Sequence, residues 1–270
     1  MPILEERSPV SRLVAALLRR RFWQRLACLL LFLGVLLTGV LLHDRQQSQS
    51  LVPLPTAIAF QQFFRRPAPE LADQTPAFEI AWAHPNNYGE RLRFNADGSL
   101  VDNEPLIVLH ETVYSADSAI DWFRRGDLED SEAASYHAII RRNGAVISIV
   151  PAQAKAYGAA ESGFDTAEGL ETLYGDPEQP PSVNSFSYHI SLETPLDGQD
   201  SDPTHSGYTV AQYRSLAWLI AQTEVPAERI TTHKEVDLSA ERIDPRSFDR
   251  DRLLKQLRQF RYRLATGTST

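Results

Sequence analysis

The chain has 270 residues, of which 43% are hydrophobic and 23% are charged, and its formal net charge is −8. This composition is that of a globular protein and excludes a disordered chain. Residues 1–25 contain six Arg and two Glu, a net charge of +4, so the rest of the chain carries −12. An acidic body argues against nucleic acid as a partner, because phosphates need a basic surface.

The chain contains a single cysteine, Cys28. A disulfide framework is therefore excluded, and so is a cysteine-rich zinc site. Any metal must be held by His, Asp or Glu side chains.

An uncharged apolar run of 17 residues, 26–42, follows four arginines near the N-terminus. Positive charge stays on the cytoplasmic side of a membrane. We therefore expect a cytoplasmic basic tail (1–25), a single-pass anchor in the inner membrane (26–43) and a periplasmic remainder. A cleaved signal peptide is the alternative, but the following HDRQQSQS lacks a small-x-small cleavage pattern, which favours an uncleaved anchor.

The segment after the anchor is polar and contains several prolines. It predicts a flexible tether over residues 44–77. A folded domain is expected over 78–265, with the part before residue 105 packing on it as an N-terminal extension. A short disordered tail, 266–270, ends the chain.

The first half of the domain alternates short apolar runs with a helical pattern. Residues 105–111 (PLIVLHE) predict a buried strand, and 116–125 predict a helix. Residues 136–142 and 145–150 are rich in β-forming residues and flank Asn143-Gly144. This dipeptide predicts a hairpin in which both turn residues have positive φ.

The second half contains a strand with clean alternation at 186–193 (FSYHISLE). Its apolar face holds Tyr188, Ile190 and Leu192, and its polar face holds Ser187, His189, Ser191 and Glu193. Thr209 and Gln212 predict a capping box before a helix to about residue 222. Residues 229–232 predict a strand and 249–264 an amphipathic helix, with apolar positions at Leu253, Leu254, Leu257, Phe260 and Leu264. The predicted fold is α/β, a single mixed sheet flanked by helices, after one N-terminal transmembrane helix.

Two of the seven histidines, His110 and His233, stand at the ends of short predicted strands. Strand ends converge in α/β folds. Asp244 follows His233 in a predicted loop. Two His and one carboxylate, with a fourth position left for water, form the ligand set of a catalytic zinc. A hydrogen-bonded structural histidine at a strand end is the alternative, and spacing alone leaves both open.

Six segments in order resemble one family: IVLHET, ASYHAIIRRNGAVISIVP, AYGAAES, NSFSYHISLE, YTVAQYRSLAWLI and TTHKEVDLSAERIDPRSFD. Over residues 105–262 the chain resembles the type-2 N-acetylmuramoyl-L-alanine amidases, a family that includes peptidoglycan recognition proteins and phage lysozyme-amidases. The resemblance implies Zn²⁺ on His110, His233 and Asp244. It also implies peptidoglycan or a muropeptide as the substrate, cut at the amide between N-acetylmuramic acid and L-alanine.

The catalytic partner departs from one of the family's two patterns. Some members carry a Glu where this chain has Ser191, and others carry a Tyr where it has Tyr136, so the resemblance favours Tyr136. Glu193, on the predicted polar face, is a second candidate for reaching the zinc water, or else a salt-bridged carboxylate. Arg242 stands where the family often has a Lys; it would stabilise an oxyanion but could not shuttle a proton.

Three further positions are expected to line the substrate groove. His189 stands where the family has Gly, Tyr157-Gly158 replaces Trp-His, and Ser191 replaces the Glu. We therefore expect His189, Tyr157 and Ser191 to bind substrate. His137, beside Tyr136, is expected to be either a packed residue or one that supports the site from behind.

Two other functions stay open at this stage. A non-catalytic peptidoglycan-binding module is one, although family members of that kind lack a metal ligand. A different zinc peptidase is the other, and the absence of His-Glu-x-x-His disfavours it. A monomer is expected, and the choice between intact murein and soluble muropeptides stays open.

Overall fold

The computed structural model describes residues 74–175 and 180–266. The predicted basic tail, the anchor and nearly all of the tether lie outside the described residues, as do 267–270. Within the described ranges, no helix is long and apolar enough to cross a membrane.

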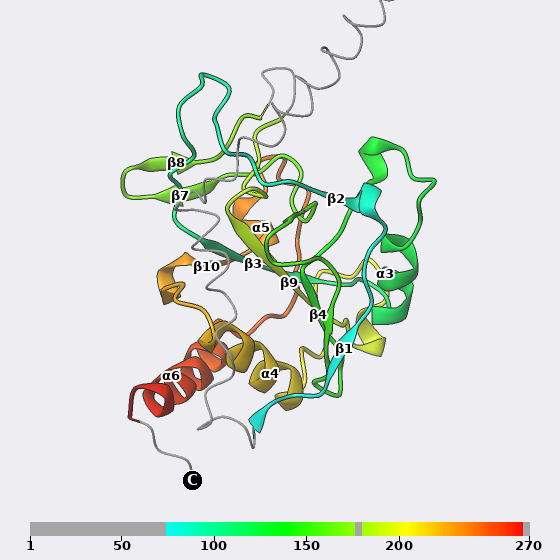
Figure 1. The fold of residues 1–270 in the computed structure, drawn as a ribbon. Helices are drawn as coiled ribbons and strands as arrows, with labels where there is room; N and C mark the ends of the chain where they lie inside the picture. The colour runs from blue at the N-terminus through cyan, green and yellow to red at the C-terminus, as the bar shows by residue number, and fades with distance from the viewer. Residues whose placement is uncertain (1–73, 176–179, 267–270) are drawn as a thin grey trace, which may run out of the picture. The chain divides into compact units, whose positions relative to one another are not determined.

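A six-stranded mixed sheet forms the centre of the domain (Figure 1). Its strands, in sheet order, are β1 (Phe78–Ile80), β5 (Val146–Ser148), β4 (Ala138–Ile140), β9 (Ser187–Leu192), β3 (Leu106–Glu111) and β10 (Ile230–Thr232). Every neighbouring pair is parallel except the β4–β5 hairpin. The predicted mixed sheet is confirmed, and β1 pairs with β5 at one edge of it.

Helices cover both faces of this sheet. On one face lie α4 (Val210–Ala221) and α6 (Arg250–Thr266), which run side by side in Figure 1. On the other lie α3 (Ala116–Phe123) and the short α5 (His233–Val236). The predicted capping box is present at the start of α4, where Thr209 and Gln212 bond each other's backbone amides.

Shorter elements fill the connections. Two small antiparallel ladders pair β2 (Tyr88–Gly89) with β6 (Lys155–Ala156) and β7 (Phe164–Thr166) with β8 (Gly169–Glu171). Four 3₁₀ turns within the described residues are η3 (Pro85–Asn87), η4 (Asp130–Glu132), η5 (Leu196–Gly198) and η6 (Ala227–Arg229).

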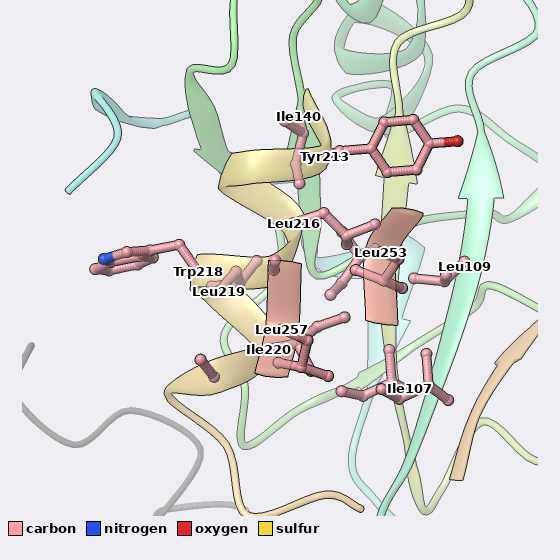
Figure 2. Close-up of a cluster of buried hydrophobic side chains, with 14 of the residues drawn as sticks. Ile107, Leu109, Ile140, Tyr213, Leu216, Trp218, Leu219, Ile220, Leu253 and Leu257 are labelled. Atoms are coloured by element: carbon pink, nitrogen blue, oxygen red, sulfur yellow. The ribbon is translucent and has the colours of Figure 1, made fainter. Parts of the chain in front are cut away.

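The largest hydrophobic cluster lies between the sheet and the α4–α6 pair (Figure 2). The inward positions of β3 are Ile107 and Leu109, and those of α6 include Leu253 and Leu257. Alternation along each strand sends every second side chain to this face. Full burial of each such leucine contributes about 1.5–3 kcal/mol.

The β4–β5 turn differs from the prediction in one respect. Its three-residue loop, 142–144, has a positive φ only at Gly144 (88°) and not at Asn143. Asn143 instead accepts a hydrogen bond from the Ala145 amide through Oδ1, at 3.0 Å. A three-residue hairpin loop needs only one left-handed residue, and Gly144 supplies it.

The opposite face of the sheet carries polar residues, and these are buried too. Ser187, His189 and Ser191 of β9 have no solvent-exposed area, although their alternation with apolar residues predicts a polar face. Buried polar groups need partners. Their neighbours on β3, β10 and the following loops form the candidate site.

Candidate metal centre

The three predicted metal ligands come from three connected elements. His110 lies near the end of β3, and His233 is the first residue of α5, directly after β10. Because β10 pairs in parallel with β3, with Thr232 opposite Leu109, the two histidines emerge side by side. Thr232 caps α5 by accepting the Glu235 amide, so the helix begins at His233.

The ligand atoms of His110, His233 and Asp244 converge. The His110 Nδ1 lies 3.5 Å from Asp244 Oδ2, and the His233 Nδ1 lies 3.0 Å from Asp244 Oδ1. One ligand atom from each residue lies within 4.8 Å of the others. Tetrahedral zinc, with bonds of about 2.0–2.1 Å, separates its ligand atoms by about 3.3 Å. The predicted clustering is confirmed, and this donor set fits zinc.

Protonation favours metal binding at this cluster. Burial lowers the pKa of His110 to about 4, so the imidazole is neutral at neutral pH. Burial opposes ionisation of Asp244, but the adjacent His110 and His233 outweigh it and hold the pKa of that carboxyl below its ordinary value. The buried His110 Nδ1 makes no hydrogen bond of normal geometry among the described residues, and Asp244 Oδ2 faces it at 3.5 Å, a spacing close to that of two ligands around one metal.

Backbone and side-chain contacts fix the loop that carries Asp244. The Lys234 amide donates to the Asp244 carbonyl oxygen at 2.9 Å. Two residues later, the guanidinium of Arg246 donates from Nε to Glu111, the neighbour of His110 in β3. This ion pair joins the loop of one ligand to the strand of another.

A buried polar network surrounds the Glu111–Arg246 pair. The Glu111 Oε2 accepts from His205 Nε2 at 3.0 Å and from the Tyr208 hydroxyl at 2.8 Å. Arg246 also donates to the backbone oxygens of Gly198, Asp200 and Asp202. This network was not predicted from the sequence. A charged residue in an apolar strand predicts a buried partner, but nothing local identifies which residue it is.

Tyr136 and Arg242 both lie near the cluster. The Tyr136 ring stacks on that of His110 with centroids 4.5 Å apart, and burial raises the pKa of its phenol, so it stays protonated. The side chain of Arg242 is exposed, and its positive charge is near enough to interact electrostatically with both His110 and Tyr136, although burial has the larger effect on each pKa. A charge at the metal position would therefore interact with both side chains.

Glu193 is placed elsewhere. Its carboxylate accepts from the Ala116 amide at 3.2 Å, at the start of α3, and from the Arg142 amide at 2.9 Å. It also lies 3.7 Å from the Arg142 guanidinium. These contacts correspond to the alternative of a salt-bridged carboxylate, and they do not support the prediction that Glu193 reaches a metal-bound water.

The predicted substrate-binding residues differ in their surroundings. His189 and Ser191 have no exposed area, so the prediction that they touch substrate is not supported. His189 contacts His110 instead, and Ser191 lies opposite His110 in the β3–β9 register. Tyr157 is half-buried beside Gly89 of β2, and its role stays a prediction.

His137 is packed below this layer, as predicted. Its ring stacks on those of Tyr188 and His189, and its Nδ1 accepts from the His189 amide at 2.9 Å. The proton therefore sits on Nε2, which donates to the Ala154 oxygen at 3.2 Å. Arg91, also missed by the sequence analysis, is buried beside this ring, and burial lowers its pKa to about 9.

Comparison with known proteins gives one family. The family model described as N-acetylmuramoyl-L-alanine amidase matches residues 102–247, and no curated protein matches. Among solved structures the chain is similar to a selenomethionine derivative of AmpD, with 24% identity, 66% of this chain and 94% of that chain covered, and a TM-score of 0.44. It is also similar to the amidase LysC from Clostridium intestinale, with 20% identity, 68% and 99% covered, and a TM-score of 0.40.

Proposed function

Because this chain is an enzyme of the N-acetylmuramoyl-L-alanine amidase family, we propose that it is a zinc amidase whose metal is held by His110, His233 and Asp244. The bond hydrolysed joins the lactyl group of N-acetylmuramic acid to L-alanine in peptidoglycan or muropeptides. The observation that carries the proposal is the convergence of three ligand atoms within 4.8 Å of one another.

Zinc bound at such a site lowers the pKa of a water ligand toward neutrality and polarises a carbonyl oxygen. The chain supplies the protonation states that this metal needs. His110 is neutral because it is buried, and Asp244 is ionised because two imidazoles adjoin it. Neutral imidazole and carboxylate are the forms that coordinate a metal.

Tyr136 and Arg242 are the side chains that support the developing charge on the substrate. The Tyr136 phenol remains a hydrogen-bond donor because burial keeps its pKa above the ordinary value. Arg242 carries a permanent charge that stabilises an oxyanion, but it does not deliver the proton that the leaving amine needs. Glu193 is left out of this assignment, since two backbone amides already bind its carboxylate.

The deciding experiment compares His233→Ala with a histidine variant away from the cluster. His233→Ala is expected to lose both bound zinc and the release of stem peptides from purified cell wall. The matched control is His84→Ala, because the His84 ring accepts the Asn86 amide at the start of η3 and belongs to no metal ligand set. Metal analysis and mass spectrometry of the products give the two readouts.

Hydrolysis retained by His233→Ala without bound zinc would overturn the assignment. Running the wild-type enzyme on murein and on soluble muropeptides separates the two substrate sources. The products show whether the enzyme cuts murein, soluble muropeptides or both.

We also propose that the domain works as a monomer on the outer side of the cytoplasmic membrane. The support is the uncharged run 26–42 that follows a cluster of arginines. Alkaline phosphatase fused after residue 77 is expected to be active, because that reporter works only outside the cytoplasm. An inactive fusion beside an active cytoplasmic reporter would contradict this orientation, and sedimentation of the purified protein tests the monomer.

A further inference from the structure

His189 lies directly behind a metal ligand. Its Nδ1 is 2.9 Å from Nε2 of His110, and the two ring centroids are 5.1 Å apart. The His189 ring has no exposed area, and its Nε2 has no hydrogen-bond partner among the described residues. Among the described residues, the His189 ring therefore has one hydrogen-bond partner, the ligand His110, beside the stacked ring of His137.

The direction of this hydrogen bond follows from the metal geometry. His110 Nδ1 is the nitrogen that faces Asp244, so a metal at the cluster takes the Nδ1 lone pair. The His110 proton must then sit on Nε2, where it donates to His189 Nδ1. In metal sites the outer nitrogen of a ligand histidine is usually held by a carboxylate, a carbonyl or water, and here the acceptor is an imidazole.

Gly158 provides the space in which the His189 ring lies. A Cβ at Gly158 would meet His189 Nδ1 at 2.4 Å and Cγ at 2.5 Å, closer than any real contact. The φ of Gly158 is not in the left-handed region, so its lack of a side chain matters for space and not for backbone shape. The two departures from the family pattern noted above, at residues 158 and 189, are thus in contact with each other.

We propose that His189 is a positioning residue for the metal: it accepts the Nε2 proton of His110 and thereby aims the Nδ1 lone pair at the metal position. The proposal rests on the assignment of His110 as a zinc ligand. It also replaces the predicted role of His189 in binding substrate. Supporting groups of this kind typically change metal affinity by about 10–100-fold.

The experiment compares two variants whose side chains have the same branched shape. His189→Asn places an acceptor oxygen near the position of Nδ1, whereas His189→Leu keeps the volume and removes the acceptor. Zinc affinity, measured by competition with a chromophoric chelator, is expected to fall about tenfold in His189→Leu and about twofold or less in His189→Asn. Gly158→Ala pushes the ring away from His110 and is expected to match His189→Leu.

A second readout needs neither zinc nor activity. In metal-free wild-type protein at neutral pH, long-range ¹H–¹⁵N correlation spectra should place the His110 proton on Nε2. The Nε2–H form should lose population in His189→Leu and in Gly158→Ala. If His189→Leu does not fold, the zinc affinity of Gly158→Ala and the position of the His110 proton in the wild-type spectrum still test the proposal.

Wild-type affinity in both His189→Leu and Gly158→Ala would overturn the proposal, and so would a His110 proton on Nδ1 in the metal-free protein. A wrong zinc assignment gives a different set of results from a wrong role for His189. In that case the wild-type chain binds no zinc, while the spectra still report whether His189 holds the His110 proton.

Discussion

The two faces of the central sheet are built from alternate residues of the same strands, yet their chemistry is opposite. Toward α4 and α6, β3 and β9 present mainly apolar or aromatic side chains, such as Leu109 and Ile190, and the one charged exception is Glu111 at the end of β3. Toward the other side they present His110, His189 and Ser191, all without exposed area. A register shift of one residue would exchange the two faces. One face of the sheet therefore stabilises the fold and the other holds the candidate site, although both are built from alternate residues of the same strands.

The largest expected effect breaks the apolar face alone. Leu253→Ala should lower the free energy of unfolding by about 2–5 kcal/mol, because it opens a cavity between α6 and the sheet. The folded variant should still bind one equivalent of zinc, since the cluster lies across the sheet. Denaturant unfolding and metal analysis test both statements, with the half-buried Leu254→Ala as the milder control. Loss of zinc from folded Leu253→Ala would show that the faces are coupled.

Acid should act on the polar face. Burial lowers the pKa of His110 to about 4 and holds the pKa of His137 and His189 below the ordinary 6.5. The unfolded chain takes up these protons near pH 6.5 and the folded chain does not, so stability is full above that pH and falls as the pH drops toward 4.

For the metal-free protein we expect a loss of about 1 kcal/mol per histidine between about pH 6.5 and 5.5, or about 3 kcal/mol in all. Urea unfolding at several pH values measures it. His189→Leu should remove about a third of the pH dependence. A free energy of unfolding that stays level over this range would contradict the assignment of neutral buried histidines.

Tyr136→Phe tests chemistry on the polar face without disturbing its packing. The ring, and with it the stacking on His110, is kept, while the hydroxyl donor is lost. We expect kcat to fall by about 100–1,000-fold with unchanged zinc affinity. An unaltered kcat would remove Tyr136 from the oxyanion site, and a loss of zinc would point to a structural role.

The smallest effect is expected at Glu193. Glu193→Gln weakens its hydrogen bonds from the Ala116 and Arg142 amides and should cost about 1–2 kcal/mol of stability. Its kcat should match that of the wild type. If kcat fell 100-fold or more while stability was unchanged, Glu193 would again be a candidate catalytic group.

Much of the fold could be predicted from local patterns. The alternation at 187–192 and the capping box at Thr209 correspond directly to β9 and α4. Strand ends predicted that His110 and His233 converge, and the resemblance to the amidase family selected these two histidines and the loop residue Asp244 as metal ligands. Parallel neighbours bring such ends together, so His110 and His233 needed no knowledge of the loops between them.

The rest depends on contacts between segments distant in the sequence. Alternation predicts the sheet face of Glu193 but not its partners, because the Ala116 and Arg142 amides that bind its carboxylate are 77 and 51 residues away in the sequence. The burial of His189 depends on the missing side chain at Gly158, and the partner of Glu111 is 135 residues away. Local periodicity carries no information on such pairs.

The Glu111–Arg246 pair has a consequence for when the enzyme becomes competent during synthesis. It closes a loop of 135 residues, and Asp244 lies inside that loop's last turn. A chain that is still being synthesised, or one truncated before Asp244, carries His110 and His233 but lacks the Asp244 carboxylate and the Glu111–Arg246 ion pair that positions it. Hydrolysis is therefore expected only after nearly the whole domain has been synthesised. Because the two residues of the ion pair are so distant in the sequence, their contact is expected to form late in folding.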